Sequence, residues 1–399
     1  MNKTADVVVI GGGAIGCSAA YHLAKRGAKV TLVEKREGLC LGASGSNQGG
    51  VAIALSPPES PLLGLIRESA RLYKSLSQEI GYDVDYQQTG LLICGVDEKQ
   101  RPIFNKHALG MQRKGVDVRV LEGDEIRKLE PVIGDDVVAG VEDWESGTVN
   151  PFKVTHGFAY AAKKMGAEFL LATNTYNIEV KENRIISVVT DKGRITTDYV
   201  VNAAGAWSPE IGQMVGITIP VKPQRGQIIV TEPLPFNERW KYICDADYLS
   251  IAFNAEEAEK STDQRTRLGV AGNYIQKTTG TWTIGSSRDF AGYNNKGTME
   301  ATSYLAKRMI QFLHKYKEVN CIRTYAGFRP FCYADDRPII SKVDNPSGFL
   351  IATGHAGKGI TLAPLTGRFI SELITENKTS MPIDAFCFSR FKNMKNESS

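Results

Sequence analysis

The chain has 399 residues, 42% hydrophobic and 23% charged, which is typical of a globular protein with a large core. A formal net charge of +4 without a lysine- or arginine-rich block argues against nucleic-acid binding. Seven scattered cysteines without C-x-x-C spacing argue against a disulfide framework or a metal site, and no apolar run approaches the ~20 residues of a membrane span. We therefore expect a cytoplasmic protein, with peripheral membrane attachment left open.

The segment from residue 6 to residue 36 predicts a dinucleotide-binding unit. It contains an apolar run, a G-x-G-x-x-G turn, an alanine-rich helix and a second apolar run that ends at an acid. In the turn, Gly11 permits a tight bend, Gly13 lets a pyrophosphate approach the backbone and Gly16 lets the helix pack close to the strand. The helix start offers N–H groups to phosphate, and Glu34 is placed to accept hydrogen bonds from a ribose. The residues expected at the dinucleotide are Gly11, Gly13, Ala14, Ile15, Gly16, Glu34 and Lys35.

The middle of the chain combines a loop of small residues with strand-rich segments. Residues 41–50 form a loop that can wrap a ligand, although a flexible surface loop has the same composition. Residues 203–208 form a second small-residue turn at a strand end, where open α/β sheets bind ligands. We expect helices over 62–80, 121–129, 150–166, 299–314 and 360–375, strands over 89–95, 175–180, 184–190, 197–202 and 348–352, and a β-rich region over 221–293.

No Ser/His/Asp set, carboxylate pair or metal-ligand spacing is present, which favours chemistry carried by a bound cofactor. A second glycine cluster, Gly354 to Gly359, opens the last helix, and its N–H groups with Lys358 can face a developing negative charge such as that of a reduced flavin; a tight turn with a solvent-facing lysine is the alternative. Arg329 lies among aromatic residues and needs an anion, either an internal acid or a substrate carboxylate. Asp335 and Asp336 fit a general base or a solvated turn.

Together these motifs resemble the D-amino-acid oxidase-like superfamily of FAD-dependent enzymes. Its members include glycine and sarcosine oxidases, D-amino-acid dehydrogenase and the flavin subunits of opine and proline dehydrogenases. The segments that carry the resemblance are Gly11–Glu34, Ala43–Gly50, Asn202–Trp207, Asn273–Gln276, Ile284–Phe290, Gly327–Pro330 and Gly354–Gly359.

The resemblance implies an α/β fold in which a Rossmann-like FAD-binding domain is interrupted by a mainly antiparallel β-sheet substrate domain with flanking helices. We expect the FAD-binding domain to comprise residues 1–85, 146–220 and 321–399, and the substrate-binding domain residues 86–145 and 221–320. The resemblance further implies that Arg329 grips a substrate carboxylate, that Tyr274 contacts the substrate and that Lys358 stabilises reduced flavin. Beyond the first unit, the implied FAD contacts are Ser44, Ser46, Asn47, Gln48, Gly49, Ala204, Gly205, Trp207, Gly327, Arg329, Gly357, Lys358, Gly359, Ile360 and Thr361.

The chain departs from the family pattern after Arg329, where Phe331 to Asp335 replaces the usual Thr-Pro-Asp. Cys332 invites a covalent flavin link like that of some sarcosine oxidases, but its distance from Asp335 in the sequence does not match the pattern of those enzymes. The small-residue loop contains no histidine, which argues against a histidyl link. We therefore expect FAD to be bound non-covalently.

The resulting prediction is FAD-dependent oxidation of the Cα–N bond of a D-amino acid, glycine, sarcosine, opine or proline-type substrate. Hydride would pass to flavin N5, giving an imine that hydrolyses. One alternative is a 2-hydroxy-acid dehydrogenase, for which His355 is the candidate base. Others are an NAD(P) dehydrogenase with Lys35 and Arg36 at a 2′-phosphate, the flavin subunit of a multi-subunit dehydrogenase, and a non-catalytic FAD-binding subunit. Oxygen, a quinone and a partner subunit all remain open as electron acceptor.

Overall fold

The chain begins with the predicted strand–helix–strand unit, formed by β2 (Val7–Ile10), α1 (Ala14–Lys25) and β3 (Val30–Val33). The two strands pair in parallel, and every residue of both is buried. Side chains of successive strand residues point to opposite faces of a sheet. Val7 and Val9 accordingly join the hydrophobic cluster that includes α1, whereas Val8 and Ile10 join the cluster on the other face. A strand buried on both faces explains the unbroken apolar run in the sequence.

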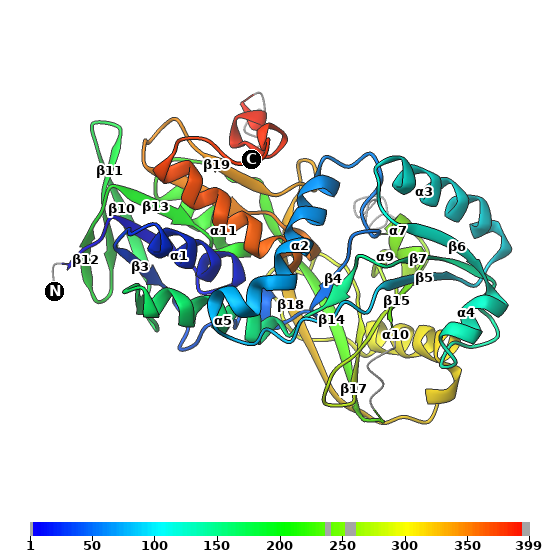
Figure 1. Cartoon of the computed structure of the whole chain (residues 1–399). Helices are drawn as coiled ribbons and strands as arrows, with labels where there is room; N and C mark the ends of the chain where they lie inside the picture. The colour runs from blue at the N-terminus through cyan, green and yellow to red at the C-terminus, as the bar shows by residue number, and fades with distance from the viewer. Residues whose placement is uncertain (1–2, 236–240, 252–260, 393–399) are drawn as a thin grey trace.

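This unit forms part of a six-stranded sheet in a computed structural model that describes residues 3–235, 241–251 and 261–392 (Figure 1). All neighbouring strands in it are parallel except the edge pair β19 and β20. The helices α1, α5 (Pro151–Lys164) and α11 (Gly359–Thr375) cover one face, and a four-stranded sheet packs over the other. In spatial order the six strands are β19 (Ile339–Lys342), β20 (Phe349–Thr353), β13 (Tyr199–Asn202), β2, β3 and β9 (Glu168–Leu170), and the four are β1 (Lys3–Thr4), β12 (Gly193–Thr196), β11 (Arg184–Thr190) and β10 (Thr175–Lys181).

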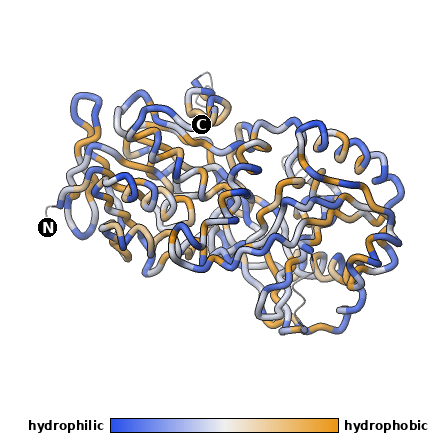
Figure 2. Tube along the Cα trace, viewed as in Figure 1, coloured by the Kyte–Doolittle hydropathy of each residue, from blue (hydrophilic) through white to orange (hydrophobic). Residues whose placement is uncertain are grey.

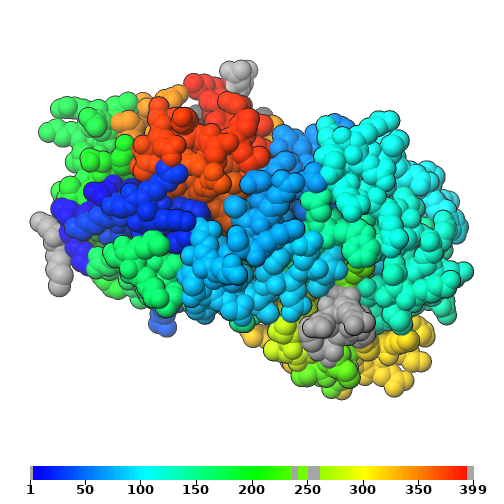
Figure 3. All heavy atoms as spheres, in the orientation of Figure 1, coloured from blue at the N-terminus to red at the C-terminus, as the bar shows by residue number. Residues whose placement is uncertain are grey.

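The second lobe is built on an eight-stranded, mainly antiparallel sheet, at the right of Figures 1 and 3. In spatial order its strands are β18 (Cys321–Cys332), β14 (Val221–Pro233), β17 (Thr281–Gly285), β16 (Asn273–Gln276), β15 (Tyr242–Asp245), β5 (Leu91–Gly95), β7 (Ala139–Asp143) and β6 (Val118–Glu122). A two-stranded ribbon of β4 (Gly50–Val51) and β8 (Gly147–Thr148) lies between the lobes.

One strand departs from the expected division of the chain. We expect residues 321–399 in the FAD-binding domain from the sequence. In the structure, β18 pairs along nearly its whole length with β14 of the second sheet. Within β18, Arg329 lies opposite Gln224 of β14. The apolar and small residues of β18 favour strand pairing, whereas the sequence carries no mark of which sheet it joins. The division itself otherwise remains our proposal.

The helices occur largely where expected. Residues 121–129 are an exception, because β6 extends to Glu122 and the helix α4 begins at Gly123. In the described residues no helix is both long and apolar enough to cross a membrane. The remaining helices are α2 (Leu62–Ile80), α3 (Arg101–Arg113), α4 (Gly123–Leu129), α5 (Pro151–Lys164), α6 (Ser208–Gln213), α7 (Asp247–Ile251), α9 (Gln264–Arg267), α10 (Met299–Phe312) and α11 (Gly359–Thr375), with short 3-10 turns at Ala43–Gly45, Glu98–Gln100, Gly205–Trp207, His314–Tyr316, Ala356–Lys358, Asp384–Phe386 and Phe388–Phe391.

The first and last long helices, α1 and α11, pack side by side although they come from opposite ends of the chain (Figure 1). Their contact is close because Gly367 of α11 lies against Ser18 of α1: a Cβ on Gly367 would stand 2.2 Å from Ser18 Oγ and 2.5 Å from its carbonyl carbon. Hydrophobic residues follow the strands beneath these helices, as the colouring in Figure 2 shows. This packing holds the two glycine-rich turns that precede α1 and α11 next to each other.

We predict opposite effects for two glycine-to-alanine changes in helices. Gly367→Ala forces a methyl group against the backbone of α1, and overpacking of this kind costs about 1–3 kcal/mol. Gly64→Ala, on the exposed face of α2 with nothing within 4 Å of the new Cβ, should stabilise by about 0.5–1 kcal/mol. Urea unfolding followed by circular dichroism would measure both, and equal midpoints for the two variants would contradict the close α1–α11 contact.

Candidate functional site

A cavity of about 360 Å³ lies between the two lobes, at the carboxyl ends of the parallel strands. Its wall is formed by the segments that follow β2, β3, β13 and β20, together with the loop 41–50, part of β18 and the start of α11. Open α/β sheets bind ligands outside the carboxyl ends of their strands. The volume is within the range of small-molecule and cofactor sites.

The first glycine turn borders this cavity and leaves the start of α1 accessible. Gly11 has φ +116°, and a Cβ there would lie 2.4 Å from Ala203 O. A Cβ on Gly16 would lie 2.0 Å from Gly11 O, so Gly16 packs helix against strand and does not line the cavity. Gly13 differs, because within 4 Å its added Cβ would meet only Ser44 Oγ, at 3.1 Å. The turn therefore combines two packing glycines with one that faces open space, as a pyrophosphate site requires.

Glu34 fixes the edge of this turn through two backbone hydrogen bonds. Its carboxylate accepts from the N–H of Gly12 at 2.6 Å and from the N–H of Arg36 at 2.8 Å. The neighbouring Lys35 places its ammonium 4.4 Å from the ring centre of Trp207, so the turns after β3 and β13 meet across the cavity. Trp207 in turn stacks on Tyr293, with the ring centres 5.3 Å apart.

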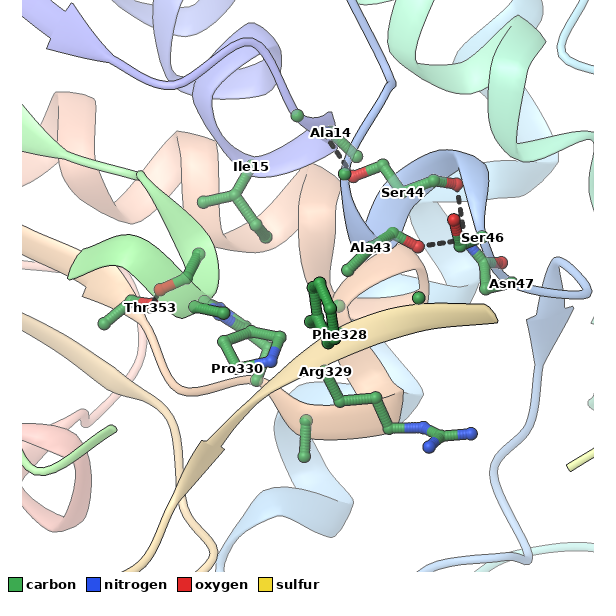
Figure 4. A pocket seen from close by; sticks show the side chains of 18 of the residues that line it. Ala14, Ile15, Ala43, Ser44, Ser46, Asn47, Phe328, Arg329, Pro330 and Thr353 are labelled. Carbon is green, nitrogen blue, oxygen red and sulfur yellow. Dashed lines mark hydrogen bonds between the residues drawn. The ribbon is translucent and has the colours of Figure 1, made fainter. Parts of the chain in front are cut away.

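The loop 41–50 joins the two lobes through its side chains. Ser44 Oγ accepts a hydrogen bond from the N–H of Ala14 at 2.9 Å, as drawn in Figure 4. Gln48 donates to the carbonyls of Asn273 at 2.9 Å and Thr283 at 2.6 Å, both in the eight-stranded sheet. Asn47 closes the loop on itself by accepting from the N–H of Gly49 at 2.7 Å. These bonds argue for a fixed loop over the cavity, in place of the flexible surface loop that the composition also allowed.

The second glycine turn faces the first across the cavity. Lys358 lies 3.8 Å from Asp336, so the Asp336 carboxylate that lines the cavity has a cationic neighbour. Burial raises the pKa of Asp336, and the charges of Lys358 and then Arg288 oppose that rise. Thr361, in the first turn of α11, donates to Gly50 O at 3.1 Å. The turn thus presents positive charge and helix N–H groups to the cavity.

Arg329 projects from β18 into the cavity without an acidic partner in the described residues (Figure 4). Its guanidinium donates to Ser286 Oγ at 2.7 Å and to Ser287 O at 3.0 Å, which are neutral acceptors. Burial, followed by the charge of Arg288, lowers the pKa of Arg329 to about 10, so the side chain remains charged at neutral pH. A charge removed from water without a counter-ion is costly, and the site is therefore complementary to an anionic ligand.

The expected substrate contact by Tyr274 is wrong. Its side chain is 0% exposed, packs on Phe312 with ring centres 5.6 Å apart and does not line the cavity. Successive residues of a strand face opposite sides of the sheet, so the preceding residue, Asn273, faces the cavity instead. The tyrosines that do line it are Tyr242, which donates to Asn273 Oδ1 at 2.6 Å, and Tyr248.

His355 lies on the cavity wall but is only 2% exposed. Its Nε2 lies 3.1 Å from Thr366 Oγ1, and burial, followed by the charge of Lys358, lowers the pKa of His355 to about 3. A histidine of such low basicity is a poor general base. Asp335 is paired with Arg337 and Arg390, both at 2.8 Å, which makes it a structural residue of the turn.

The structure brings most of the expected residues to one cavity and adds several that the sequence did not mark. Apart from Tyr274 and Gly16, each expected catalytic or cofactor-binding residue lines it. Among the additional residues, Arg288 lies within Ile284–Phe290, one of the segments that carry the resemblance to the family. The cavity-lining polar residues to which the sequence assigned no role are Ser56, Thr173, Asn174, Thr175, Glu210, Gln224, Tyr242, Tyr248, Asn273, Ser286, Arg288 and Thr353.

Known proteins resemble the chain over nearly its whole length. Residues 6–373 match the model of a family described as DAO, FAD dependent oxidoreductase. The chain is 29% identical over 433 aligned positions to hydrogen cyanide synthase subunit HcnC of Pseudomonas aeruginosa, covering 98% of this chain and 97% of that protein. Two solved structures are 26% identical to it: L-proline dehydrogenase from P. horikoshii, with a TM-score of 0.85 and coverage of 98% and 99%, and glycine oxidase from Bacillus cereus, with a TM-score of 0.82 and coverage of 94% and 96%.

The burial of His355 predicts a loss of stability in mild acid. The folded state holds this imidazole neutral down to about pH 3, whereas an unfolded histidine binds its proton near the ordinary pKa of 6.5. The unfolded state therefore binds more protons between these values, and the free energy of unfolding should fall as the pH drops below about 6.5. His355→Asn should remove up to about 1.4 kcal/mol per pH unit from that slope.

Urea midpoints measured between pH 7 and pH 5 would test this, with His156→Asn on the exposed part of α5 as the control for loss of a histidine. If the free energy of unfolding depended on pH in the same way for the parent chain and His355→Asn, His355 would be protonated as easily in the folded state as in the unfolded state.

Proposed function

The chain belongs to the family of FAD dependent oxidoreductases described as DAO, and from that premise we propose that it oxidises the Cα–N bond of an amino acid or N-substituted amino acid. The observation that carries the proposal is Arg329, a cavity-lining guanidinium that, within the part of the chain the structure describes, donates hydrogen bonds to Ser286 and Ser287 and not to a carboxylate. The names of the relatives, glycine oxidase and L-proline dehydrogenase, agree with a substrate that carries a carboxylate next to an amine.

The residues of the cavity fit FAD, the cofactor of the family. Gly13, the start of α1 and Ser44 would hold the pyrophosphate, because the cavity is open in front of Gly13 and this N-cap residue has no side chain of its own to cap the helix. Glu34 and Lys35 would lie at the adenosine. The turn with Lys358 and the first residues of α11 would face the flavin ring, where positive charge favours a reduced, anionic flavin.

FAD, when bound, supplies the two-electron oxidant and accepts hydride at flavin N5. The residues of the chain bind and aim the substrate. A guanidinium has five N–H donors. Among residues 3–235, 241–251 and 261–392, the bonds to Ser286 and Ser287 use two of them, which leaves three for a carboxylate. Arg329 would fix the carboxylate and thereby the direction of the adjacent Cα–H, which is catalysis by positioning.

An amine substrate suits this cavity better than a hydroxy acid. An amine that arrives neutral loses hydride without a protein base, and water then hydrolyses the imine product to the carbonyl compound and the free amine. A 2-hydroxy acid must instead give its hydroxyl proton to a base, and His355, the candidate for that task, has a pKa lowered to about 3 by burial. This difference in basicity supports the amine reaction.

Among the possible electron acceptors we propose a partner protein. HcnC is named as a subunit of a synthase, and a partner subunit would reoxidise the flavin without releasing peroxide. An oxygen electrode separates the alternatives, because an oxidase consumes oxygen with each turnover, whereas a dehydrogenase needs an added quinone, dye or partner.

We predict that Arg329→Leu disables carboxylate binding while leaving FAD in place. Loss of a charge-assisted contact to a buried carboxylate costs about 2–5 kcal/mol, so KM should rise about 30-fold or more. The measurement is anaerobic bleaching of the flavin by a panel of amino acids, N-methylglycines and opines. Arg323→Leu, on the exposed part of the same strand, is the matched control. Unchanged kinetics in Arg329→Leu would remove the anchor assignment.

We also predict that FAD is released on acid denaturation. Cys332, the one cysteine close to Arg329 in the sequence, is 0% exposed, lies 3.4 Å from Asp335 through its sulfur and does not line the cavity. Trichloroacetic acid should therefore leave a colourless pellet and a yellow supernatant. A yellow pellet would demonstrate a covalent link and contradict the prediction.

A further inference from the structure

Besides Arg329, the cavity wall contains Arg288, an arginine that the proposed reaction does not require. It is 7% exposed, and its guanidinium carbon lies 4.2 Å from the ring centre of Tyr248. Its guanidinium donates a long hydrogen bond of 3.4 Å from Nη1 to Gly269 O. In the described residues no carboxylate lies within 4.0 Å of Arg288.

Two other arginines of the same lobe, one buried and one half-buried, have acidic partners. Arg225, 5% exposed, is paired with Asp289, and Arg308 contacts the buried Asp245 at 2.5 Å. In both pairs the guanidinium charge is neutralised within the fold. Arg288 and Arg329, which line the cavity, are the exceptions among these four.

The two exceptions are neighbours. Arg329 donates to Ser286 and Ser287, the two residues that directly precede Arg288. Their charges interact, since Arg288 contributes to the lowered pKa of Arg329. Asp336, the acid near them on the wall, already has Lys358 at 3.8 Å. Two like charges held this close without anions are unfavourable in a partly buried site.

Both arginines also converge on one patch of the wall, at Gly357. A Cβ on Gly357 would lie 3.8 Å from Arg329 Nε and 3.6 Å from the hydroxyl of Tyr248. Tyr248 carries Arg288 against its ring. The absence of a side chain at Gly357 therefore leaves room between the two cationic groups.

We propose that the substrate is a dicarboxylic amine, with one carboxylate on Arg329 and the second on Arg288. The class comprises N-carboxyalkyl amino acids and acidic amino acids. This inference rests on the proposed function for the reaction, since the oxidised Cα–N bond lies between or beside the two carboxylates. The step itself is unchanged: the Cα–H leaves as hydride, the nitrogen lone pair forms the C=N bond, and FAD is reduced. Arg288 thus determines specificity by binding the second anion.

Unreactive ligands can test the second anion site in the FAD-loaded protein. Diglycolate and methoxyacetate have an ether oxygen in place of the amine nitrogen, and they differ in the second carboxylate. Their dissociation constants would be measured by the perturbation of the flavin absorbance. We expect the parent protein to bind diglycolate about tenfold or more tightly than methoxyacetate, since a hydrogen bond to a charged group contributes about 1.5–3 kcal/mol.

Arg288→Met should reduce this ratio to about two or less while methoxyacetate binding is retained, and Arg288→Lys, which keeps the charge, should give an intermediate ratio. Arg323→Met, a charge deletion outside the cavity, should keep the parent ratio. A parent ratio near one, or the same ratio in Arg288→Met, would overturn the proposal.

A parallel comparison of iminodiacetate and sarcosine as flavin reductants distinguishes failure of the proposed reaction from failure of the dicarboxylate site. If neither amine, nor any other tested, reduces the flavin while diglycolate is still preferred, the proposed reaction fails and the dicarboxylate site stands. If sarcosine reduces the flavin as well as iminodiacetate does and diglycolate is not preferred, the dicarboxylate site fails and the reaction stands.

Discussion

The pairing of β18 with β14 is the contact on which the site depends. It extends over nearly the whole of both strands and carries Arg329 from the second sheet to the carboxyl edge of the first. Backbone hydrogen bonds of a long ladder are individually modest, but together they fix the register of every side chain along it. A shift by one residue would turn Arg329 away from the cavity. The position of the cationic group is therefore set by backbone pairing and not by a salt bridge.

The same region places charge where the fold alone would not favour it. Arg225 and Arg308 are neutralised within the protein, whereas Arg288 and Arg329 rely on neutral acceptors and an aromatic ring. Guanidinium charges without a counter-ion lower the stability of the ligand-free protein, and binding of an anion raises it again. FAD and a carboxylate substrate should therefore stabilise the protein by mass action.

The sequence was sufficient for the parts of the fold that depend on local pattern. The strand–turn–helix at Gly11 follows from hydrophobic periodicity and glycine spacing, and the structure contains it as expected. Tyr274 was misplaced because one residue of register decides which face of β16 meets the cavity, and composition does not fix that register. Arg288 lies in a segment that resembles the family, but the sequence alone does not mark it as a site residue, since whether an arginine has an acidic partner is a tertiary property. The placement of β18 in the second sheet is non-local for the same reason.

The contact between α1 and α11 also sets the order of events during synthesis. Arg26, just after α1, bonds Thr375 at the end of α11, a separation of 349 residues. At ribosomal rates of about 5–20 residues per second, this delay amounts to roughly 20–70 s. Through that interval the nascent chain exposes the apolar side of α1 that α11 later covers. The packing of α1 is thus completed only after α11 has been synthesised.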